Sequence, residues 1–408
     1  MAATPTDTST RATADASAQA LFRWHPATRT FEGGSPAAPG GPLEQLHKAI
    51  LGGRGFAVTP DGIGNDHACL PPGILHCQTG GTTGTPKLIE RSHASWIASF
   101  AQNARAFGIG PGTGLACFGG LSHSLALYAA VEAVHLGANI HLLHGLRPRA
   151  QITELRQHGM AVLYATPAQL ALLTTVQAAL PSVRHVLCGG GQLGPDLRGK
   201  VRALCPNAQI AVFYGASETS FVTLSDSSTP AGSVGRAYGA AQIEIRSADG
   251  TPTNGTGEVW VSSPYLFGRY ASGHSPETRR DCAFLTVGEM GWLDAGGHLY
   301  LAGRRDRMVR IAEQSVHPET LEALLLADPD VALACVLPRA DAARGQVLVA
   351  VIAGADDPAL AARLDHACRA AFGPLVAPRR YHFLPDFPLH AAGKPDLSRI
   401  AAWLDARE

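Results

Sequence analysis

The stretch Gln78-Thr79-Gly80-Gly81-Thr82-Thr83-Gly84-Thr85-Pro86-Lys87 decides how the rest of this chain is interpreted. Its glycines let backbone N–H groups approach an anion closely, its threonine hydroxyls add hydrogen-bond donors, and Lys87 adds a positive charge. These features predict a loop that binds phosphate, whereas a plain surface turn is the alternative for any Gly- and Thr-rich segment. The loop is not a Walker A motif, because its lysine follows proline and no Gly-Lys-Ser/Thr sequence opens a helix.

Three later segments favour the phosphate-binding interpretation. Val212-Phe213-Tyr214-Gly215-Ala216-Ser217-Glu218-Thr219 predicts a buried strand that runs into a tight turn presenting a hydroxyl and a carboxylate. Gly303-Arg304-Arg305-Asp306-Arg307-Met308-Val309 follows a strand-like segment, and Ala392-Gly393-Lys394-Pro395-Asp396 lies near the C-terminus. In this order the four motifs resemble those of the ANL adenylate-forming superfamily, which includes acyl- and aryl-CoA synthetases.

The resemblance covers residues 70 to 400 and implies an α/β fold. It implies a large N-terminal domain, built from a doubly wound α/β layer and a β-rich subdomain, followed by a small α+β C-terminal domain. We expect a disordered tail over residues 1–20, a shortened adenylate-forming domain over 21–305 and a mobile C-terminal domain over 306–408. Relatives usually have a longer segment before the phosphate loop, so the chain resembles a compact member of the family.

The composition favours small-molecule chemistry. The 408 residues, 46% of them hydrophobic, exceed what one core usually supports. The 33 basic and 33 acidic residues balance, which gives no electrostatic case for binding nucleic acid or a membrane. Met1 to Ala20 lacks the apolar region of a secretory signal, and no stretch is apolar enough to span a bilayer. We therefore expect a cytoplasmic enzyme.

The eight cysteines are scattered singly, a pattern typical of a reducing compartment. His67, Cys69, His76 and Cys77 lie close together in the sequence and raise the question of a metal site. Their spacing matches no common zinc pattern, so we interpret them as structural residues.

Helical and strand-like patterns alternate between Pro86 and Ala240, which predicts the doubly wound layer. The expected helices are 92–107, 124–136, 152–158, 167–180 and 195–204, and the expected strands are 114–118, 138–143, 162–165, 183–188 and 209–214. From Gly235 to Leu301 short strands with Gly and Asp-Gly turns predict the β-rich subdomain, with strands at 242–246, 258–262 and 298–301. For the C-terminal domain the expected helices are 318–326 and 358–371, and the expected strands are 331–337, 347–352 and 381–384.

The resemblance implies roles for individual residues in ATP binding. Thr79, Gly80, Gly81, Thr82, Thr83, Gly84 and Lys87 correspond to the loop that holds the β- and γ-phosphates. Glu218 corresponds to the Mg²⁺ ligand, which suits the preference of Mg²⁺ for carboxylate and phosphate oxygens. Ser217 corresponds to the residue that touches the α-phosphate. Gly190 and Gly191 correspond to the loop beside the adenine and acyl pockets, and Tyr214, followed by Gly215, corresponds to the residue that stacks on adenine.

Residues nearer the C-terminus correspond to the moving parts of the family. Lys394 corresponds to the adenylation lysine between the carboxylate and the α-phosphate, Asp306 to the hinge residue, and Arg304 to a ribose contact. Two positions depart from the family pattern. Glu289 stands where relatives have an aspartate that holds both ribose hydroxyls, and Glu313 stands where they have a glycine that lets the pantetheine thiol approach.

His123 falls in the segment that lines the acyl pocket in the family, where its role would be to hydrogen-bond a ring hydroxyl or to gate the carboxylate. The alternative is a structural histidine whose hydrogen bonds are satisfied within the protein. Pro86–His93 is similar to the corresponding run in aryl-acid ligases, which favours an aromatic acid. The expected reaction is ATP- and Mg²⁺-dependent activation of an aryl or short acyl acid, then transfer to CoA or a carrier protein's phosphopantetheine. The alternatives are adenylation with a non-CoA acceptor and a non-catalytic nucleotide-binding homologue.

Overall fold

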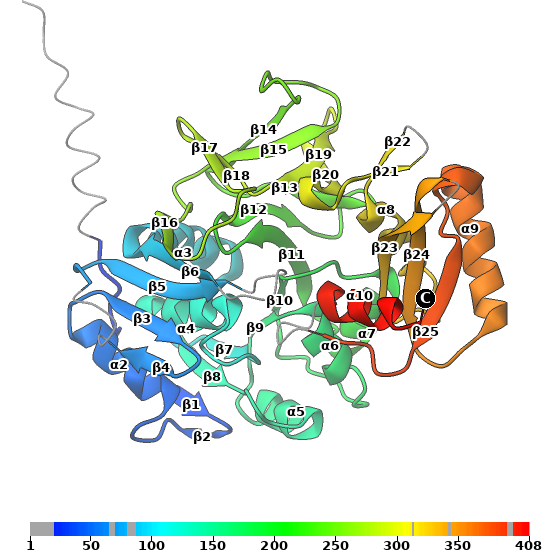
Figure 1. The fold of residues 1–408 in the computed structure, drawn as a ribbon. Coiled ribbons are helices and arrows are strands. Elements are labelled where there is room, and N and C mark those ends of the chain that lie inside the picture. Colours follow the sequence, from blue (N-terminus) through cyan, green and yellow to red (C-terminus); the bar gives the residue numbers. More distant parts are fainter. Residues whose placement is uncertain are drawn as a thin grey trace, which may run out of the picture.

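The computed structural model describes residues 20–64, 70–79, 87–311, 314–341, 344–389 and 395–407. A parallel sheet forms the centre of the larger part of the chain (Figure 1). Neighbouring strands in it follow the order β11-β10-β9-β7-β8-β1 and all run parallel. Their bounds are β1 Thr30–Glu32, β7 Gly114–Cys117, β8 Asn139–Leu142, β9 Val162–Ala165, β10 His185–Cys188 and β11 Gln209–Ala216.

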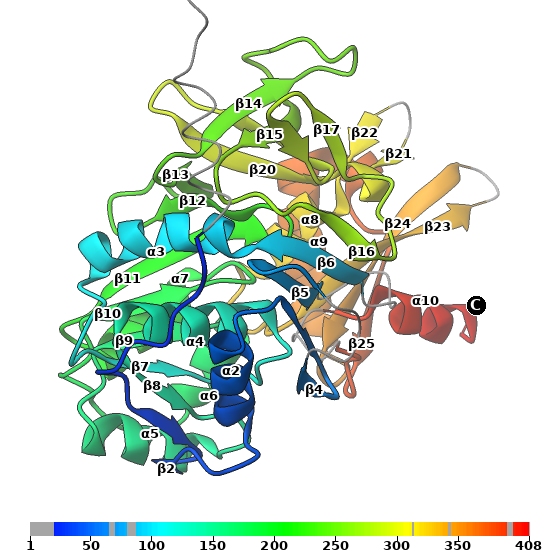
Figure 2. The ribbon, with the colours of Figure 1, turned by 90° about the vertical axis from the view of Figure 1, so that its left-hand side faces the viewer.

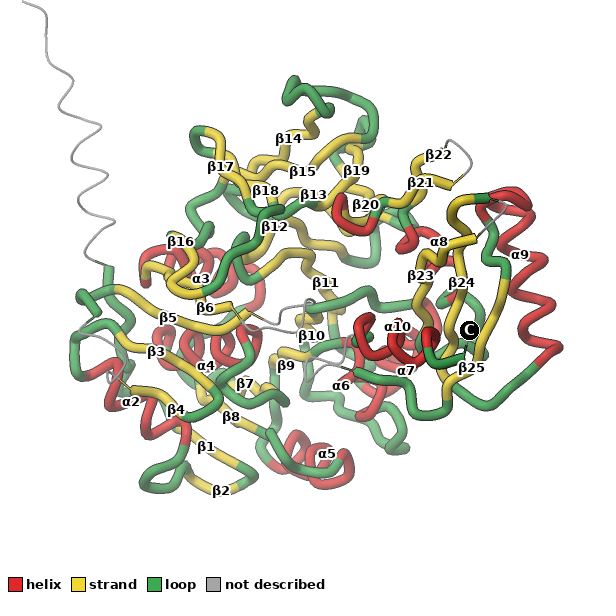
Figure 3. The backbone as a smooth tube through the Cα atoms, in the orientation of Figure 1, coloured by secondary structure: helices red, strands yellow, loops and turns green. Residues whose placement is uncertain are grey.

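Helices cover both faces of this parallel sheet. One core packs α3 (His93–Phe107) and α4 (Ser124–Leu136) against alternate strand residues such as Leu115 and Ile140. The other core packs α5 (Pro148–Gln157), α6 (Pro167–Leu173) and α7 (Pro195–Leu204) against the intervening residues. The red helices on either side of the yellow strands in Figure 3 show this arrangement. A strand that is buried on both faces has a continuous run of apolar residues in its sequence. This explains why Val162-Leu163-Tyr164-Ala165 lacks the alternation of polar and apolar residues.

The β-rich segment continues the same sheet in antiparallel fashion and does not form a separate one. β12 pairs with β11, and the order then runs β13-β20-β19-β15-β18-β17, with β14 pairing β15 (Figure 2). The bounds are β12 Ser220–Ser225, β13 Ser233–Ala237, β14 Gln242–Arg246, β15 Gly257–Ser262, β17 Arg279–Asp281, β18 Phe284–Thr286, β19 Glu289–Leu293 and β20 His298–Arg304.

A second, five-stranded sheet lies beside α3 and α4 and has the order β16-β6-β5-β3-β4. Its bounds are β3 Phe56–Thr59, β4 Gly62–Gly64, β5 Ile74–Thr79, β6 Lys87–Ser92 and β16 Arg269–Ser272. The short helix α2 (Pro42–Leu51) contacts β4, and β2 (Ser35–Pro36) pairs with β1. β5 and β6 are adjacent antiparallel strands, so the predicted phosphate loop joins them directly.

The C-terminal part has its own sheet, β23-β24-β25, and its own apolar cores. Helices α8 and α9 pack on one face of this sheet, and α10 packs on the other. A hairpin of β21 and β22 precedes them. The bounds are β21 Val309–Ile311, β22 Gln314–Val316, α8 Pro318–Leu325, β23 Ala334–Asp341, β24 Gly345–Ala353, α9 Pro358–Val376, β25 Arg380–Leu384 and α10 Leu397–Asp405.

The α/β architecture expected from the sequence is confirmed, and the differences concern element ends and the β-rich segment, which continues the parallel sheet. α4, β9, α7 and β14 have the predicted bounds. The helix predicted over 167–180 ends at Leu173, the helix predicted from 152 begins at Pro148, and the strand predicted from 331 begins at Ala334. Among the described residues, no helix combines the length and the apolar character needed to cross a bilayer.

Candidate active site

The described ends of the predicted phosphate loop lie opposite each other. Thr79 at the end of β5 and Lys87 at the start of β6 are register partners in the antiparallel pair. Thr79 is buried, and the Lys87 Nζ atom lies 5.9 Å from the centre of the Tyr270 ring. Gly80, Gly81, Thr82, Thr83 and Gly84 lie outside the described residues.

The turn between β11 and β12 presents the predicted carboxylate. The strand pairing shifts register between Tyr214 and Gly215, and a Cβ at Gly215 would lie 1.7 Å from the Ser220 carbonyl oxygen. Only glycine permits this close approach of the two backbones. The Thr219 hydroxyl accepts a 2.9 Å hydrogen bond from the Ala216 N–H and closes the turn. Ser217 and Glu218 therefore project, half-buried, from a tightly held segment.

Tyr270 on β16 connects the two halves of this site. Its hydroxyl donates a 2.7 Å hydrogen bond to Glu218 Oε1, and its ring faces the Lys87 ammonium group. A carboxylate has about four acceptor positions, so a single phenol leaves Glu218 with capacity to coordinate a cation. Hard cations such as Mg²⁺ take carboxylate oxygens, and the residues present at this turn therefore fit the ion that the family resemblance implies.

The N-terminus of α4 completes the same region. The Ser124 hydroxyl donates a 3.1 Å hydrogen bond to the Gln78 carbonyl and lies 3.1 Å from the Ser217 hydroxyl. His123 is the N-cap residue of α4, so the positive end of the helix dipole and the imidazole are next to each other. Burial and the neighbouring His144 lower the pKa of His123, which keeps the ring neutral at pH 7.

Arg91 and Tyr270 hold the site together. Neither residue was assigned a role from the sequence, although Arg91 lies within the run Pro86–His93. The Arg91 guanidinium, 1% exposed, donates 2.5 and 2.7 Å hydrogen bonds to the carbonyls of Ser217 and Tyr265. Burial lowers the pKa of Arg91 to about 10, which still leaves the side chain charged at pH 7. These partners lie 126 and 174 residues away along the chain, so no local spacing could have indicated them.

The predicted adenine contact Tyr214 lies on β11, and the predicted ribose contacts lie on β19 and β20 of the same sheet. Glu289 and Arg304 are register partners on β19 and β20. Burial opposes the charged form of Arg304, but the carboxylates of Glu289 and Asp306 outweigh it and raise its pKa, with a smaller effect of Glu218. Burial and Glu289 also raise the pKa of the Tyr214 phenol. Tyr214 and Arg304 thus both lie close enough to the Glu289 carboxylate for its charge to shift their pKa values.

Gly190 and Gly191 follow the C-terminal end of β10 and are exposed there. Gly190 has a φ of +85°, and a Cβ at Gly191 would lie 3.4 Å from the Pro167 ring. Because β10 is the direct neighbour of β11, the two glycines lie at the same edge of the sheet as the Glu218 turn.

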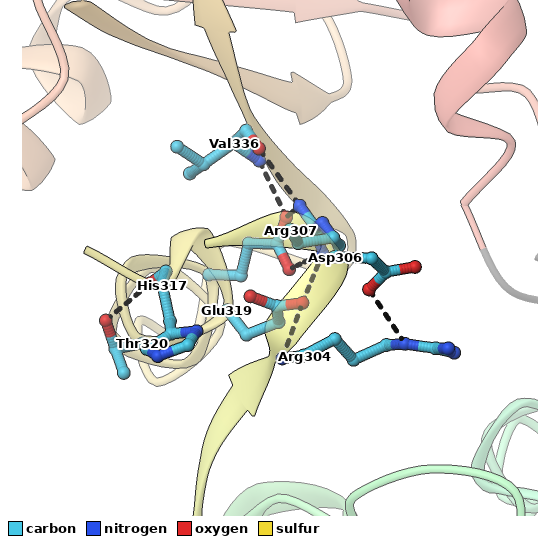
Figure 4. A network of polar contacts seen from close by, with 8 residues as sticks. Arg304, Asp306, Arg307, His317, Glu319, Thr320 and Val336 are labelled. Atoms are coloured by element: carbon cyan, nitrogen blue, oxygen red, sulfur yellow. Dashed lines mark hydrogen bonds and ion pairs between the residues drawn. The ribbon is translucent and has the colours of Figure 1, made fainter. Parts of the chain in front are cut away.

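Asp306, the predicted hinge residue, lies between two arginines that pair with carboxylates on different sides of the junction. Figure 4 shows Asp306 and the second of these arginines, Arg307. Arg305 pairs with Glu277 at 2.7 Å, before the junction, whereas Arg307 pairs with Glu322 at 2.6 Å, after it. Arg307 also donates a 3.0 Å hydrogen bond to the Val336 carbonyl. Asp306 itself accepts a 3.2 Å hydrogen bond from Arg304 Nε. Lys394 and Glu313 lie outside the described residues.

Comparisons with known proteins show the family to which the chain belongs. The AMP-binding enzyme family matches residues 74–271, and its C-terminal domain family matches residues 320–394. The chain is 32% identical to YhfT, an uncharacterized acyl-CoA ligase of Bacillus subtilis (strain 168), over 80% of this chain and 68% of that protein. It is 28% identical to the 2-succinylbenzoate–CoA ligase of Enterococcus faecalis, over 78% of this chain and 66% of the relative.

Among solved structures, the amide bond synthetase McbA from Marinactinospora thermotolerans matches with a TM-score of 0.71 and 26% identity. That match covers 83% of this chain and 71% of the synthetase. The chain therefore belongs to the AMP-binding enzymes of the ANL adenylate-forming superfamily. It spans about two thirds of the length of the curated relatives named above.

Proposed function

We propose that this chain activates an aryl or short acyl carboxylic acid with ATP and transfers the acyl group to a thiol, that of CoA or of a carrier protein's phosphopantetheine. The observation that carries this proposal is the meeting of three segments at one place. The ends of the β5–β6 loop, the turn with Ser217 and Glu218, and the N-terminus of α4 are joined by the hydrogen bonds of Tyr270 and Ser124.

The first half-reaction forms a mixed anhydride. A carboxylate oxygen of the acid attacks the α-phosphorus of ATP, the bond from that phosphorus to the bridging oxygen breaks, and pyrophosphate leaves with the electron pair. In the second half-reaction the thiol sulfur attacks the acyl carbon, loses its proton, and displaces AMP. Catalysis of such transfers rests on positioning and on neutralising charge.

The chain's residues divide these tasks between them. Lys87 and the loop that begins at Thr79 hold the β- and γ-phosphates, and the Ser217 hydroxyl donates to the α-phosphate. Glu218 holds Mg²⁺, which when bound neutralises phosphate charge and orients the leaving pyrophosphate. Neutral His123 at the start of α4 orients the acid's carboxylate. The Lys394 ammonium group donates a hydrogen bond to an oxygen of the same carboxylate as negative charge shifts towards the phosphate.

A further group of residues binds the nucleoside. The Tyr214 ring stacks on adenine beside Gly190, Gly191 and Gly215, and the Glu289 carboxylate accepts hydrogen bonds from both ribose hydroxyls. Glutamate can do so from one methylene further out than the aspartate of relatives. Arg304, next to Glu289 on the neighbouring strand, supplies a donor to the same ribose.

Acid-dependent ATP–pyrophosphate exchange tests the proposal. The panel consists of benzoates, cinnamates and short- to medium-chain fatty acids, each measured with and without CoA. We expect exchange with one class of acid and, for that acid, CoA-dependent release of AMP. Absence of exchange with every acid, together with measurable ATP binding, would overturn the proposal in favour of a non-catalytic nucleotide-binding protein.

A second candidate is adenylation followed by transfer to an amine. The similarity to an amide bond synthetase at 26% identity favours it, as does the glutamate at position 313, which adds bulk and charge where relatives admit a thiol. The two candidates separate when the acid that supports exchange is incubated with ATP and either CoA or a series of amines. Amide product without thioester would establish the second candidate.

Asp306→Pro should separate the two half-reactions. The residue lies in a one-turn 3₁₀ helix over Arg305–Arg307. Helices of this type generally have φ values of about −50 to −70°, which proline also adopts, so proline is compatible with the observed arrangement. Because the observed arrangement is kept, we expect pyrophosphate exchange within a few-fold of the original chain. Because proline prevents a change of φ at the hinge, we expect thioester formation lowered about tenfold or more. Asp306→Ala, which loses the Arg304 contact but keeps backbone freedom, is the matched control. An equal loss of both half-reactions in the proline variant would contradict a hinge at this position.

A further inference from the structure

A cluster of two imidazoles and a carboxylate lies at the edge of the parallel sheet, where the adenylation site does not use it. His141 is on β8, and Glu154 and His158 lie one turn apart at the end of α5. One potential ligand atom from each residue lies within 4.8 Å of those of the other two. Figures 1 and 2 show α5 beside β8 and the short strands β1 and β2.

The cluster lies several strands away from the Glu218 turn, whereas His123 follows β7, the direct neighbour of β8. β7, β9 and β10 lie between β8 and β11, the strand that ends in the Glu218 turn. His141 is the register partner of Ala116 on β7, which belongs to the core under α5, so its side chain points to the α5 face. The three residues are therefore not part of the ATP, acid or hinge machinery described above.

The polar atoms of this cluster are poorly satisfied within the protein. His141 is 2% exposed, and its Nδ1 atom has no hydrogen-bond partner. The buried Glu154 Oε2 atom also accepts no hydrogen bond, although it lies 3.4 Å from His158 Nε2 in ion-pair range. Buried polar atoms are normally paired, because leaving one unpaired costs about 1–3 kcal/mol. The cluster therefore contains two buried polar atoms without a hydrogen-bond partner in the protein, which a bound ion would supply.

Neighbouring residues hold the three side chains in place. The Phe31 ring on β1 stacks on His141 with centroids 4.2 Å apart and lies 5.3 Å from the His158 ring. The turn after β1 covers Glu154 so closely that a Cβ at Gly34 would lie 2.6 Å from the carboxylate carbon. Three separate chain segments thus converge on the cluster, which gives it a preformed geometry.

We propose that His141, Glu154 and His158 bind a divalent transition-metal ion, with Zn²⁺ the ion they fit best, which ties α5 to β8 at the sheet edge. Two imidazoles and one carboxylate are a ligand set that zinc sites use, with water as the fourth ligand. The 3.4 Å separation of Glu154 and His158 matches the spacing of about 3.4 Å between ligands of a tetrahedral zinc with bonds of about 2.0–2.1 Å. Mg²⁺ favours oxygen ligands and does not compete for two imidazoles.

The plain alternative is a buried structural His141 beside a Glu154–His158 contact on the helix surface. That alternative predicts no affinity for zinc beyond that of scattered surface histidines.

Zinc binding to the full chain tests the proposal. The protein is treated with a chelator, desalted, and titrated with Zn²⁺ against a chromophoric competitor, and a Co²⁺ titration reports the coordination geometry. We expect one ion per chain, visible Co²⁺ absorption of low-symmetry coordination, and a thermal midpoint raised by several degrees with Zn²⁺ but not with millimolar Mg²⁺.

Variants locate the ion. His158→Gln and Glu154→Gln should each weaken Zn²⁺ binding about 100-fold or more and abolish the thermal shift. Pyrophosphate exchange should persist, because neither residue is among those proposed to bind ATP or the acid. His366→Gln, at an exposed histidine on α9, is the matched control and should bind as the original chain does. Equal zinc affinity in all four proteins, or no one-to-one binding at micromolar Zn²⁺, would overturn the proposal. A loss confined to His366→Gln would likewise place the ion elsewhere.

Discussion

Glu218→Gln should lower acid-dependent pyrophosphate exchange by about 10²- to 10³-fold with little change in folding. The substitution keeps the size of the side chain and an acceptor for the 2.7 Å hydrogen bond from Tyr270, so the turn between β11 and β12 stays in place. It removes the negative charge with which, in our proposal, Glu218 holds Mg²⁺. The loss of one preorganised electrostatic contact to a transition state typically costs this much.

The dependence on Mg²⁺ distinguishes this role from a structural one. In Glu218→Gln the Mg²⁺ concentration that gives half-maximal exchange should rise, and excess Mg²⁺ should recover part of the rate. Tyr270→Phe keeps the ring against Lys87 and removes only the hydroxyl, so we expect a smaller loss of about tenfold. Glu244→Gln on β14, a partly exposed carboxylate paired with Arg246, is the control for the change of charge and should leave exchange intact. A folded Glu218→Gln variant with undiminished exchange would remove Glu218 from the mechanism.

Local sequence signals are sufficient to predict the bounds of an element where nearby residues mark both its start and its end. α4 was predicted with the observed bounds because its apolar run ends at Gly137, which has a φ of +88° and caps the helix. α6 was predicted too long. Its start is marked by a capping box of Thr166 and Gln169, but no glycine marks its end. The helix stops at Thr174 and Thr175, whose hydroxyls bond back to the carbonyls of Ala171 and Leu172.

The site shows the same division between local and long-range information. Gly215, Ser217 and Glu218 were recognisable because a tight turn after a buried strand has a local signature. Tyr270 was not, because its importance comes from a hydrogen bond to a residue 52 positions away. The continuity of the β-rich segment with the parallel sheet was also missed, since it depends on the pairing of β11 with β12 across the turn at Gly215. Sequence spacing says which groups are present, and strand pairing decides which of them meet.

Lys394→Ala should abolish adenylation, lowering exchange about 10³-fold or more, and should leave ATP affinity near that of the original chain. The physical reason is the shift of negative charge during the reaction. As the carboxylate attacks, negative charge passes onto the oxygens between the acyl carbon and the α-phosphorus, and a lysine there stabilises the transition state more than bound ATP. Lys87, which we propose holds the β- and γ-phosphates, is unchanged in this variant, so we expect the affinity for ATP to be retained. Binding measured with labelled ATP and exchange measured on the same preparation give the two values.

The sharpest control for this lysine supplies the intermediate itself. Chemically prepared acyl-adenylate bypasses the first half-reaction, so Lys394→Ala given that compound and the acceptor should form product at close to the original rate. The chain has only four lysines, and Lys200→Ala on α7, where the side chain is exposed and paired with Asp196, is the matched control. Unchanged exchange in Lys394→Ala would exclude the lysine from adenylation. Loss of ATP binding together with exchange would instead assign it to holding the nucleotide, because a residue that acts only on the transition state leaves ground-state affinity untouched.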